Sequence, residues 1–114
     1  MRRGEVWLIN LDPTVGSEIK KTRPAIIVSD DAIGILPLKV IVPVTDWKDR
    51  YAIAPWMVQV EHDGENGLSK RSAADAFQIR SVSEQRFAKR LGRVGTATMK
   101  AIEDAILAVA GIER

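Results

Sequence analysis

The chain has no cysteine and only one histidine among its 114 residues. Without cysteine it can form no disulfide, no catalytic thiolate and no thiolate metal site, so packing alone must hold the fold, as is usual in a reducing compartment. With a single histidine, His62, one chain cannot build an acid-base pair from two histidines. His62 lies in the turn-forming stretch 62–67, which predicts a surface loop residue.

Long apolar runs are also missing. No stretch approaches the roughly 20 residues of a membrane-spanning helix. The first residues, Met-Arg-Arg-Gly-Glu, lack the apolar core and cleavage site of a secretory signal. We therefore expect a soluble, cytoplasmic protein without a membrane partner. The length suits one hydrophobic core, which predicts a single domain over residues 1–114.

The local patterns of metal and nucleotide sites are absent as well. No carboxylate spacing resembles an EF-hand loop or a helical Glu-x-x-His pair, and there is no glycine-rich phosphate loop. These absences argue against a metal-dependent or nucleotide-hydrolysing enzyme. We expect neither a metal site nor a cofactor.

The chain has a mild basic excess, with 17 lysines and arginines against 15 acidic residues and a pI near 9.2. The basic residues cluster at Arg2-Arg3, Lys20-Lys21-x-Arg23, Lys70-Arg71 and Lys89-Arg90-x-x-Arg93. If folding gathers these clusters on one face, they form a phosphate-binding surface; otherwise they are solvated surface residues. Charge alone leaves both interpretations open.

Short runs of apolar, β-branched and aromatic residues predict a mainly β, α+β fold. The predicted strands span residues 5–11, 25–29, 38–45, 51–60 and 74–82, with a shorter strand near 91–94 and a helical turn within 83–89. Pro43 cannot donate to a strand ladder, which indicates a sheet edge or a bulge just before Thr45.

Apolar residues recur at helical spacing from Met99 to Val109. Thr96 or Thr98 can cap the start of this helix and Gly111 its end, so an amphipathic helix of about four turns is expected to close the chain. Strands followed by one helix predict a curled antiparallel sheet, approaching a small barrel, with the helix packed against it.

The polar segment 12–24 is long for a connection between two strands, where about two to five residues are usual in a hairpin. It ends in Arg23-Pro24, and a residue before proline is restricted to extended backbone. The Arg23 guanidinium is therefore well placed, and its planar fork of donors suits a phosphate. A surface arginine at the start of a strand is the alternative interpretation.

The run from Arg3 to Ser29 resembles the opening signature of the MazF/PemK family of toxin endoribonucleases. The resemblance continues through Val-Pro-Val-Thr at 42–45, Gly67, Ala74-Asp75 and Gln-Ile-Arg-Ser at 78–81, and it covers essentially the whole chain. It implies a small SH3-like, plasmid-maintenance-toxin barrel that forms a homodimer. It also implies metal-independent cleavage of single-stranded RNA and silencing by a cognate, acidic, MazE-like antitoxin.

The same resemblance assigns the catalytic residues Arg23 and Thr45, with Glu18 as the loop acid and first candidate for the base. RNA carries its own nucleophile, the 2′-hydroxyl, so the enzyme needs chiefly positioning and charge stabilisation. Arg23 would stabilise the phosphate in the transition state and Thr45 would hydrogen-bond a phosphate oxygen or the 2′-hydroxyl. The expected products are a 2′,3′-cyclic phosphate and a 5′-hydroxyl.

The expected RNA-binding residues are Ser17, Lys20, Lys21, Trp47, Lys48, Gln78 and Arg80. Trp47 is a candidate stacking platform for a base, although it could equally cover the end of the barrel. Trp7 and Trp56 lie in predicted strands, which favours core or dimer-interface positions.

Two alternatives come from other functional classes. A toxin of the same fold that poisons DNA gyrase relies on a C-terminal Trp-Gly-Ile, whereas this chain has Ala110-Gly111-Ile112. A non-catalytic nucleic-acid-binding barrel would need only the basic clusters, and the Arg23 and Thr45 pairing argues against it.

Overall fold

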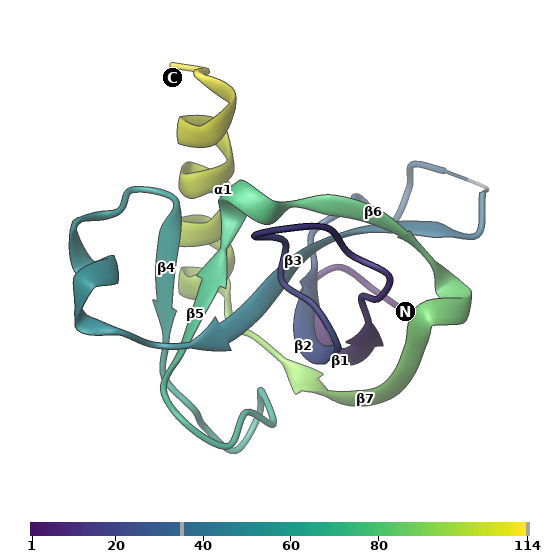
Figure 1. The fold of residues 1–114 in the computed structure, drawn as a ribbon. Helices are drawn as coiled ribbons and strands as arrows, with labels where there is room; N and C mark the ends of the chain where they lie inside the picture. Colours follow the sequence, from purple (N-terminus) through teal and green to yellow (C-terminus); the bar gives the residue numbers. More distant parts are fainter. Residues whose placement is uncertain (35, 114) are drawn as a thin grey trace.

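The structure is a computed structural model that describes residues 1–34 and 36–113. In these residues the chain forms seven strands, three short 3-10 helices and one α-helix (Figure 1). The strands are β1 (Glu5–Asn10), β2 (Thr22–Ile27), β3 (Leu38–Asp46), β4 (Met57–Val60), β5 (Ser72–Asp75), β6 (Arg80–Ser83) and β7 (Phe87–Arg93). The helices are η1 (Asp49–Ile53), η2 (Ala76–Gln78), η3 (Glu84–Arg86) and α1 (Thr96–Ala110).

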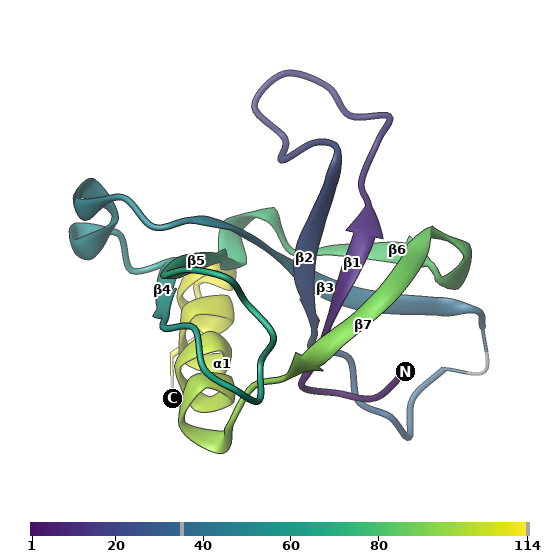
Figure 2. The same ribbon diagram turned by 90° about the horizontal axis from the view of Figure 1, so that it is seen from below.

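The strands form one antiparallel sheet in the order β4-β5-β3-β2-β1-β7, with β6 also paired to β3. Residues 38–41 of β3 pair with β6, and residues 44–46 pair with β5. The sheet therefore changes direction along β3, and Figures 1 and 2 show it curled around β1 and β2. The predicted curled antiparallel sheet is confirmed. No pairing within the described residues joins its end strands β4 and β7, so the sheet is not closed into a barrel.

Pro43 lies inside the sheet, not at its edge. It pairs with Ala25 of β2 on one side of β3. On the other side, the partner strand is interrupted by η2 between the β5 and β6 ladders. The predicted sheet edge is therefore wrong, and the residue that lacks an N–H sits where β3 exchanges one partner for another.

Both faces of β2 carry buried side chains, and successive side chains of a strand point to opposite faces. On β2, Ile26 belongs to the cluster under α1, whereas Ala25 and Ile27 belong to a second cluster on the other face. The helix covers the first cluster with Ile102, and both figures show α1 beside β4 and β5.

The predicted C-terminal helix is confirmed, but its start differs from the prediction. The residue before the helix is Gly95, no side chain caps the first turn, and the predicted threonine cap is therefore wrong. Gly111 ends the helix in the left-handed region with a φ of 72°, as expected of a glycine cap. No helix in the described residues is long and apolar enough to cross a membrane.

Three predicted strands have different bounds in the structure. The strand expected at 51–60 begins only at Met57, because η1 occupies the preceding residues. The strand expected at 74–82 is broken by η2, which starts where the Asp75 side chain accepts a hydrogen bond from the Phe77 N–H at 3.1 Å. The short strand expected at 91–94 is longer, since β7 begins at Phe87 directly after the expected helical turn at η3.

Candidate active site

Arg23 and Thr45 line one cavity of about 370 Å³, here called the Arg23–Thr45 pocket. Their strands are neighbours, and Ala25 of β2 pairs with Pro43 of β3. Extending this antiparallel register by two residues sets Arg23 opposite Thr45 on the same face of the sheet. Strand pairing thus brings together two side chains that are 22 positions apart in the sequence.

The Arg23 guanidinium is held by the main chain. Its Nε donates to the Lys20 carbonyl at 3.3 Å, and within residues 1–34 and 36–113 no carboxylate forms a salt bridge with it. Thr45 is half-buried and is anchored by backbone pairing with Ala73 of β5. The pocket therefore presents a permanent positive charge and a hydroxyl, which together suit a phosphate group.

The loop at 67–70 also lines the pocket, although no motif in the sequence predicts this. Lys70 lies there with its Nζ 3.1 Å from the Asp46 carboxylate, and both side chains are more than half exposed. In the sequence, Lys70 stands out only as part of the basic pair Lys70-Arg71. No local pattern places it in this pocket, because the pairing of Asp46 in β3 with Ser72 in β5 brings it there.

This loop is held rigidly against β7. The buried Asn66 accepts hydrogen bonds from the Asp63 and Leu68 N–H groups and donates to the Glu61 carbonyl at 2.8 Å. A Cβ on Gly92 would lie 2.0 Å from the Glu65 carbonyl oxygen, so only glycine allows this approach of loop to strand.

Glu18 and Ser17 line a different cavity of about 510 Å³, here called the loop cavity, together with Gln78 and Arg80. The Glu18 carboxylate accepts a hydrogen bond from the Val15 N–H at 2.8 Å, which caps a turn in its own loop. The structure therefore brings Arg23 and Thr45 together but places Glu18 in the neighbouring cavity.

Gln78 and Arg80 contact the main chain of the connection between β1 and β2. The Gln78 side chain bonds to the backbone of Ser17 and Ile19, and Arg80 donates to the Leu11 carbonyl at 3.3 Å. Their polar ends thus already have protein partners.

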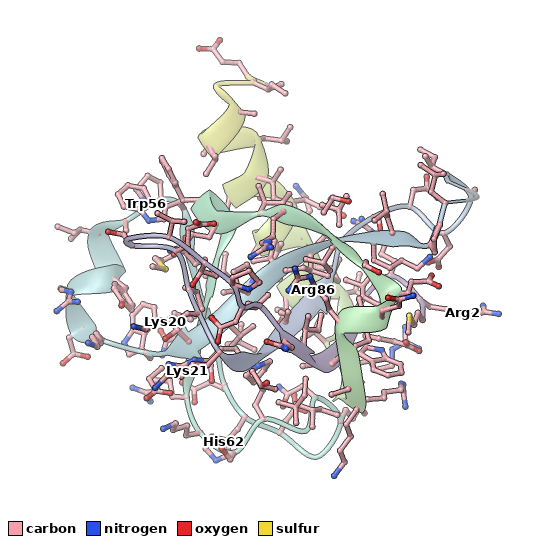
Figure 3. All side chains as sticks on the ribbon, turned by 45° about the vertical axis from the view of Figure 1, so that its right-hand side comes forward. Arg2, Lys20, Lys21, Trp56, His62 and Arg86 are labelled. Atoms are coloured by element: carbon pink, nitrogen blue, oxygen red, sulfur yellow. The ribbon has the colours of Figure 1, made fainter. Side chains whose placement is uncertain are left out.

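The predicted lysines and the tryptophans differ in exposure. Lys20, Lys21 and Lys48 are exposed, and Figure 3 shows Lys20 and Lys21 on the same side of the molecule. Trp47 is half-buried and packs edge-on against Tyr51, with ring centroids 5.8 Å apart. It does not line the Arg23–Thr45 pocket.

Trp7 and Trp56 differ in position and burial. Trp7 lies in β1, where it packs against the second core cluster and meets Phe87 edge-on at 5.6 Å. Trp56 is 38% exposed, lies before β4 and not inside a strand, and contacts Phe77 at 6.0 Å. His62 is exposed, as predicted for a loop residue.

The sequence matches, over residues 2–110, the family model described as PemK-like, MazF-like toxin of type II toxin-antitoxin system. The chain belongs to this family. Two curated relatives are named endoribonucleases: MazF9 of Mycobacterium tuberculosis and PemK of Escherichia coli. MazF9 is 34% identical over 93% of this chain and 92% of its own length. PemK is 36% identical over 90% of this chain and 76% of its own length.

Solved structures of MazF proteins share the fold. MazF of Deinococcus radiodurans has a TM-score of 0.80 at 22% identity, covering 98% of this chain and 97% of that one. An endoribonuclease from a mycobacterial species, solved with its cognate antitoxin, has a TM-score of 0.78 at 23% identity, covering 100% of this chain and 98% of that one. The predicted MazF/PemK resemblance is thereby confirmed at the level of family and fold.

Proposed function

We propose that this chain is a sequence-selective endoribonuclease toxin that cleaves single-stranded RNA, such as mRNA, in the Arg23–Thr45 pocket. The observation that carries the proposal is the shared pocket itself: Arg23 and Thr45 lie on the paired strands β2 and β3, and both line one cavity. Family membership and the names of the curated relatives support the same activity.

The proposed reaction uses the RNA's own 2′-hydroxyl as the nucleophile on the adjacent phosphorus. The 2′-oxygen bonds to phosphorus, the bond to the 5′-oxygen breaks, and that oxygen leaves with a proton, giving a 2′,3′-cyclic phosphate and a 5′-hydroxyl. Arg23 stabilises the added negative charge and Thr45 hydrogen-bonds a phosphate oxygen or the 2′-hydroxyl. Arg23 acts as a charge stabiliser and not as a proton donor, because a guanidinium keeps its proton in proteins.

Glu18 is the proposed base. Its carboxylate caps the turn at Val15 in the loop cavity, so the loop must carry it to the Arg23–Thr45 pocket before it can take the proton of the 2′-hydroxyl. The exposure of the loop makes this movement feasible, since Glu18 has no burial to hold it.

RNA on either side of the pocket would contact the exposed loop groups Ser17, Lys20, Lys21 and Lys48. Trp47 is the proposed stacking platform, close in sequence to Thr45 and beside the cationic Arg50, which lies over the Tyr51 ring at 5.4 Å. Gln78 and Arg80 could join RNA binding only by exchanging their main-chain partners.

The proposal includes the biological setting that the family implies. The chain would act as a homodimer in the cytoplasm, inhibit translation and growth, and be neutralised by a cognate, acidic, MazE-like antitoxin. Solved relatives in complex with antitoxins support the last element.

Cleavage of a single-stranded RNA by the purified protein in excess EDTA tests the reaction. We expect fragments that carry a 2′,3′-cyclic phosphate and a 5′-hydroxyl, with cuts at a restricted set of sequences. A strict requirement for magnesium, or 5′-phosphate products, would contradict the proposed chemistry. An unselective ladder of cuts would contradict the sequence selectivity.

A further inference from the structure

The connection between β1 and β2 rises away from the sheet (Figure 2) and is held by side chains that come from residues 78–86. Arg80 donates to the Leu11 carbonyl, and Arg86 donates to the carbonyls of Asn10 and Asp12. The two arginines hold the end of the connection that leaves β1.

Gln78 holds the end of the connection that approaches β2. Its Oε1 accepts from the Ile19 N–H at 2.6 Å, and its Nε2 donates to the Ser17 carbonyl at 3.2 Å. Only one orientation of the amide satisfies both bonds, because a main-chain N–H can only donate and a carbonyl can only accept. The side chain therefore acts as a two-point clamp on residues 17–19.

The clamp lies one residue from the group that orients Arg23. Residue Lys20, next to the clamped Ile19, supplies the carbonyl that accepts from Arg23 Nε. Lys21 follows with a φ of 69°, in the left-handed region that a lysine adopts only under constraint. Its carbonyl accepts from the Leu11 N–H at 3.0 Å, which closes the foot of the loop.

Gln78 is itself fixed by its surroundings. It ends the short helix η2, whose first turn is capped by the buried Asp75. Asp75 accepts a hydrogen bond from the Phe77 N–H at 3.1 Å, and the Ile79 N–H donates to the Ala76 carbonyl at 3.3 Å. The backbone that carries Gln78 is thus fixed by η2 itself, as the support of a side chain that locates another group must be.

From these contacts we propose that Gln78 is a positioning residue: it holds the loop so that the Lys20 carbonyl orients the Arg23 guanidinium in its pocket. This inference rests on the proposed RNA cleavage, and it assigns Gln78 a role in the rate of the chemical step and not in RNA contact.

Three variants test this role. Gln78→Met keeps the length of the side chain and loses both hydrogen bonds, whereas Gln78→Glu keeps an acceptor for Ile19 and loses the donor to Ser17. Gln85→Met is the matched control, since Gln85 is exposed on η3. Single-turnover cleavage rate and RNA affinity are measured separately, and hydrogen exchange at the Ile19 amide reports on the clamp.

We expect Gln78→Met to slow cleavage by about 10- to 100-fold, the range for small misplacement of a reacting group, while the RNA Kd stays within about threefold. Gln78→Glu should also slow cleavage, because its carboxylate keeps the acceptor for Ile19 but faces the Ser17 carbonyl oxygen without a proton to share. Gln85→Met should match wild type. The Ile19 amide should exchange faster in Gln78→Met alone.

A weaker Kd with an unchanged rate would overturn the proposal, because it would make Gln78 an RNA contact. An unchanged rate in both Gln78 variants would overturn it as well. If wild-type protein fails to cleave RNA, the proposed function falls and the catalytic role with it. Faster exchange at Ile19 in Gln78→Met would then still support the clamp as a feature of the loop. Should Gln78→Met fail to fold, the cleavage rate of Gln78→Glu decides.

Discussion

The Arg23–Thr45 pocket and the loop cavity are lined by different residues and are built differently. The first has Arg23 and Thr45 on paired strands, and its far wall is a loop packed directly onto β7. The second lies under the β1–β2 connection, which side chains hold by hydrogen bonds to its main chain. The first depends on backbone register, the second on individual polar contacts.

The difference has energetic consequences. The residues that follow Arg23 on its strand, 25–27, are fully buried, and each large apolar side chain among them stabilises by about 1.5–3 kcal/mol. A hydrogen bond in the loop contributes only about 0.5–1.5 kcal/mol net. Chemistry placed on strands is therefore well fixed, while the adjoining loop can open for a ligand.

Removing the two strand-borne groups should have the largest effect. Arg23→Ala and Thr45→Ala should each lower the RNA cleavage rate by about 100- to 1000-fold, as when one donor that stabilises transition-state charge is lost. Circular dichroism should show an intact fold. The matched controls are Arg2→Ala and Thr96→Ala, both at exposed positions. Full cleavage or full toxicity of either pocket variant would refute the assignment.

The packing of the loop at Glu65 on Gly92 of β7 should be the next most sensitive feature. Gly92→Ala forces a Cβ onto the Glu65 carbonyl and should lower the free energy of unfolding by about 1–3 kcal/mol. Gly64→Ala is the control, because a Cβ there meets nothing within 4 Å. Urea denaturation measures both. Equal stability of the two variants would show that the loop does not pack on β7 as described.

The smallest expected effect is the pH dependence of stability that comes from Asp75, the residue that caps η2 beside the loop cavity. Burial raises the pKa of Asp75 above 3.8, more than its hydrogen bonds from Phe77 and Gln78 lower it. Ionisation of Asp75 therefore costs the folded state more than the unfolded state. Its contribution to stability is present below pH 3.8 and is lost as pH rises through the raised pKa. Asp75→Asn should become more stable relative to wild type as pH rises from 3 to 7, by urea denaturation.

Glu5→Gln is the control for this pH dependence and should show the opposite sign. Burial of Glu5 alone would raise its pKa, but hydrogen bonds from Trp7 and Arg2 and the charges of the amino terminus and Arg90 lower it below 4.5. Wild type should therefore lose its advantage over Glu5→Gln as pH falls below 4.5. The same pH trend in both variants would contradict the opposite environments of the two carboxylates.

Local patterns predicted the strands whose side chains alternate between two buried faces. The first strand was expected at 5–11 and lies at Glu5–Asn10, and the third was expected at 38–45 and lies at Leu38–Asp46. The pattern misled at 51–60, because the first part of this range lies in or after η1, whose last residue, Ile53, is 92% exposed. It also missed the break at η2, because that break depends on which strand β3 pairs with.

Some residues of the candidate site were likewise predicted from the sequence, and others were not. Arg23 and Thr45 were predicted from the Arg-Pro step, the nearby Pro43 and the family resemblance, and they share a pocket. Lys70 gave no such signal, since it reaches that pocket through strand pairing far along the chain. The main-chain partners of Gln78 could not be predicted either, since Gln78 was expected to bind RNA and its contacts with Ser17 and Ile19 join segments about 60 residues apart in the sequence.

Residue order and short-range pattern were thus enough to predict the family, the curled antiparallel sheet, the closing helix and the two groups proposed for catalysis. These depend on periodicity, on proline geometry and on a long run of matching residues. The folded chain was needed to separate the two cavities, to place Glu18 away from Arg23 and to turn Gln78 toward the loop. Such features depend on register and on contacts between distant segments, which no local pattern encodes.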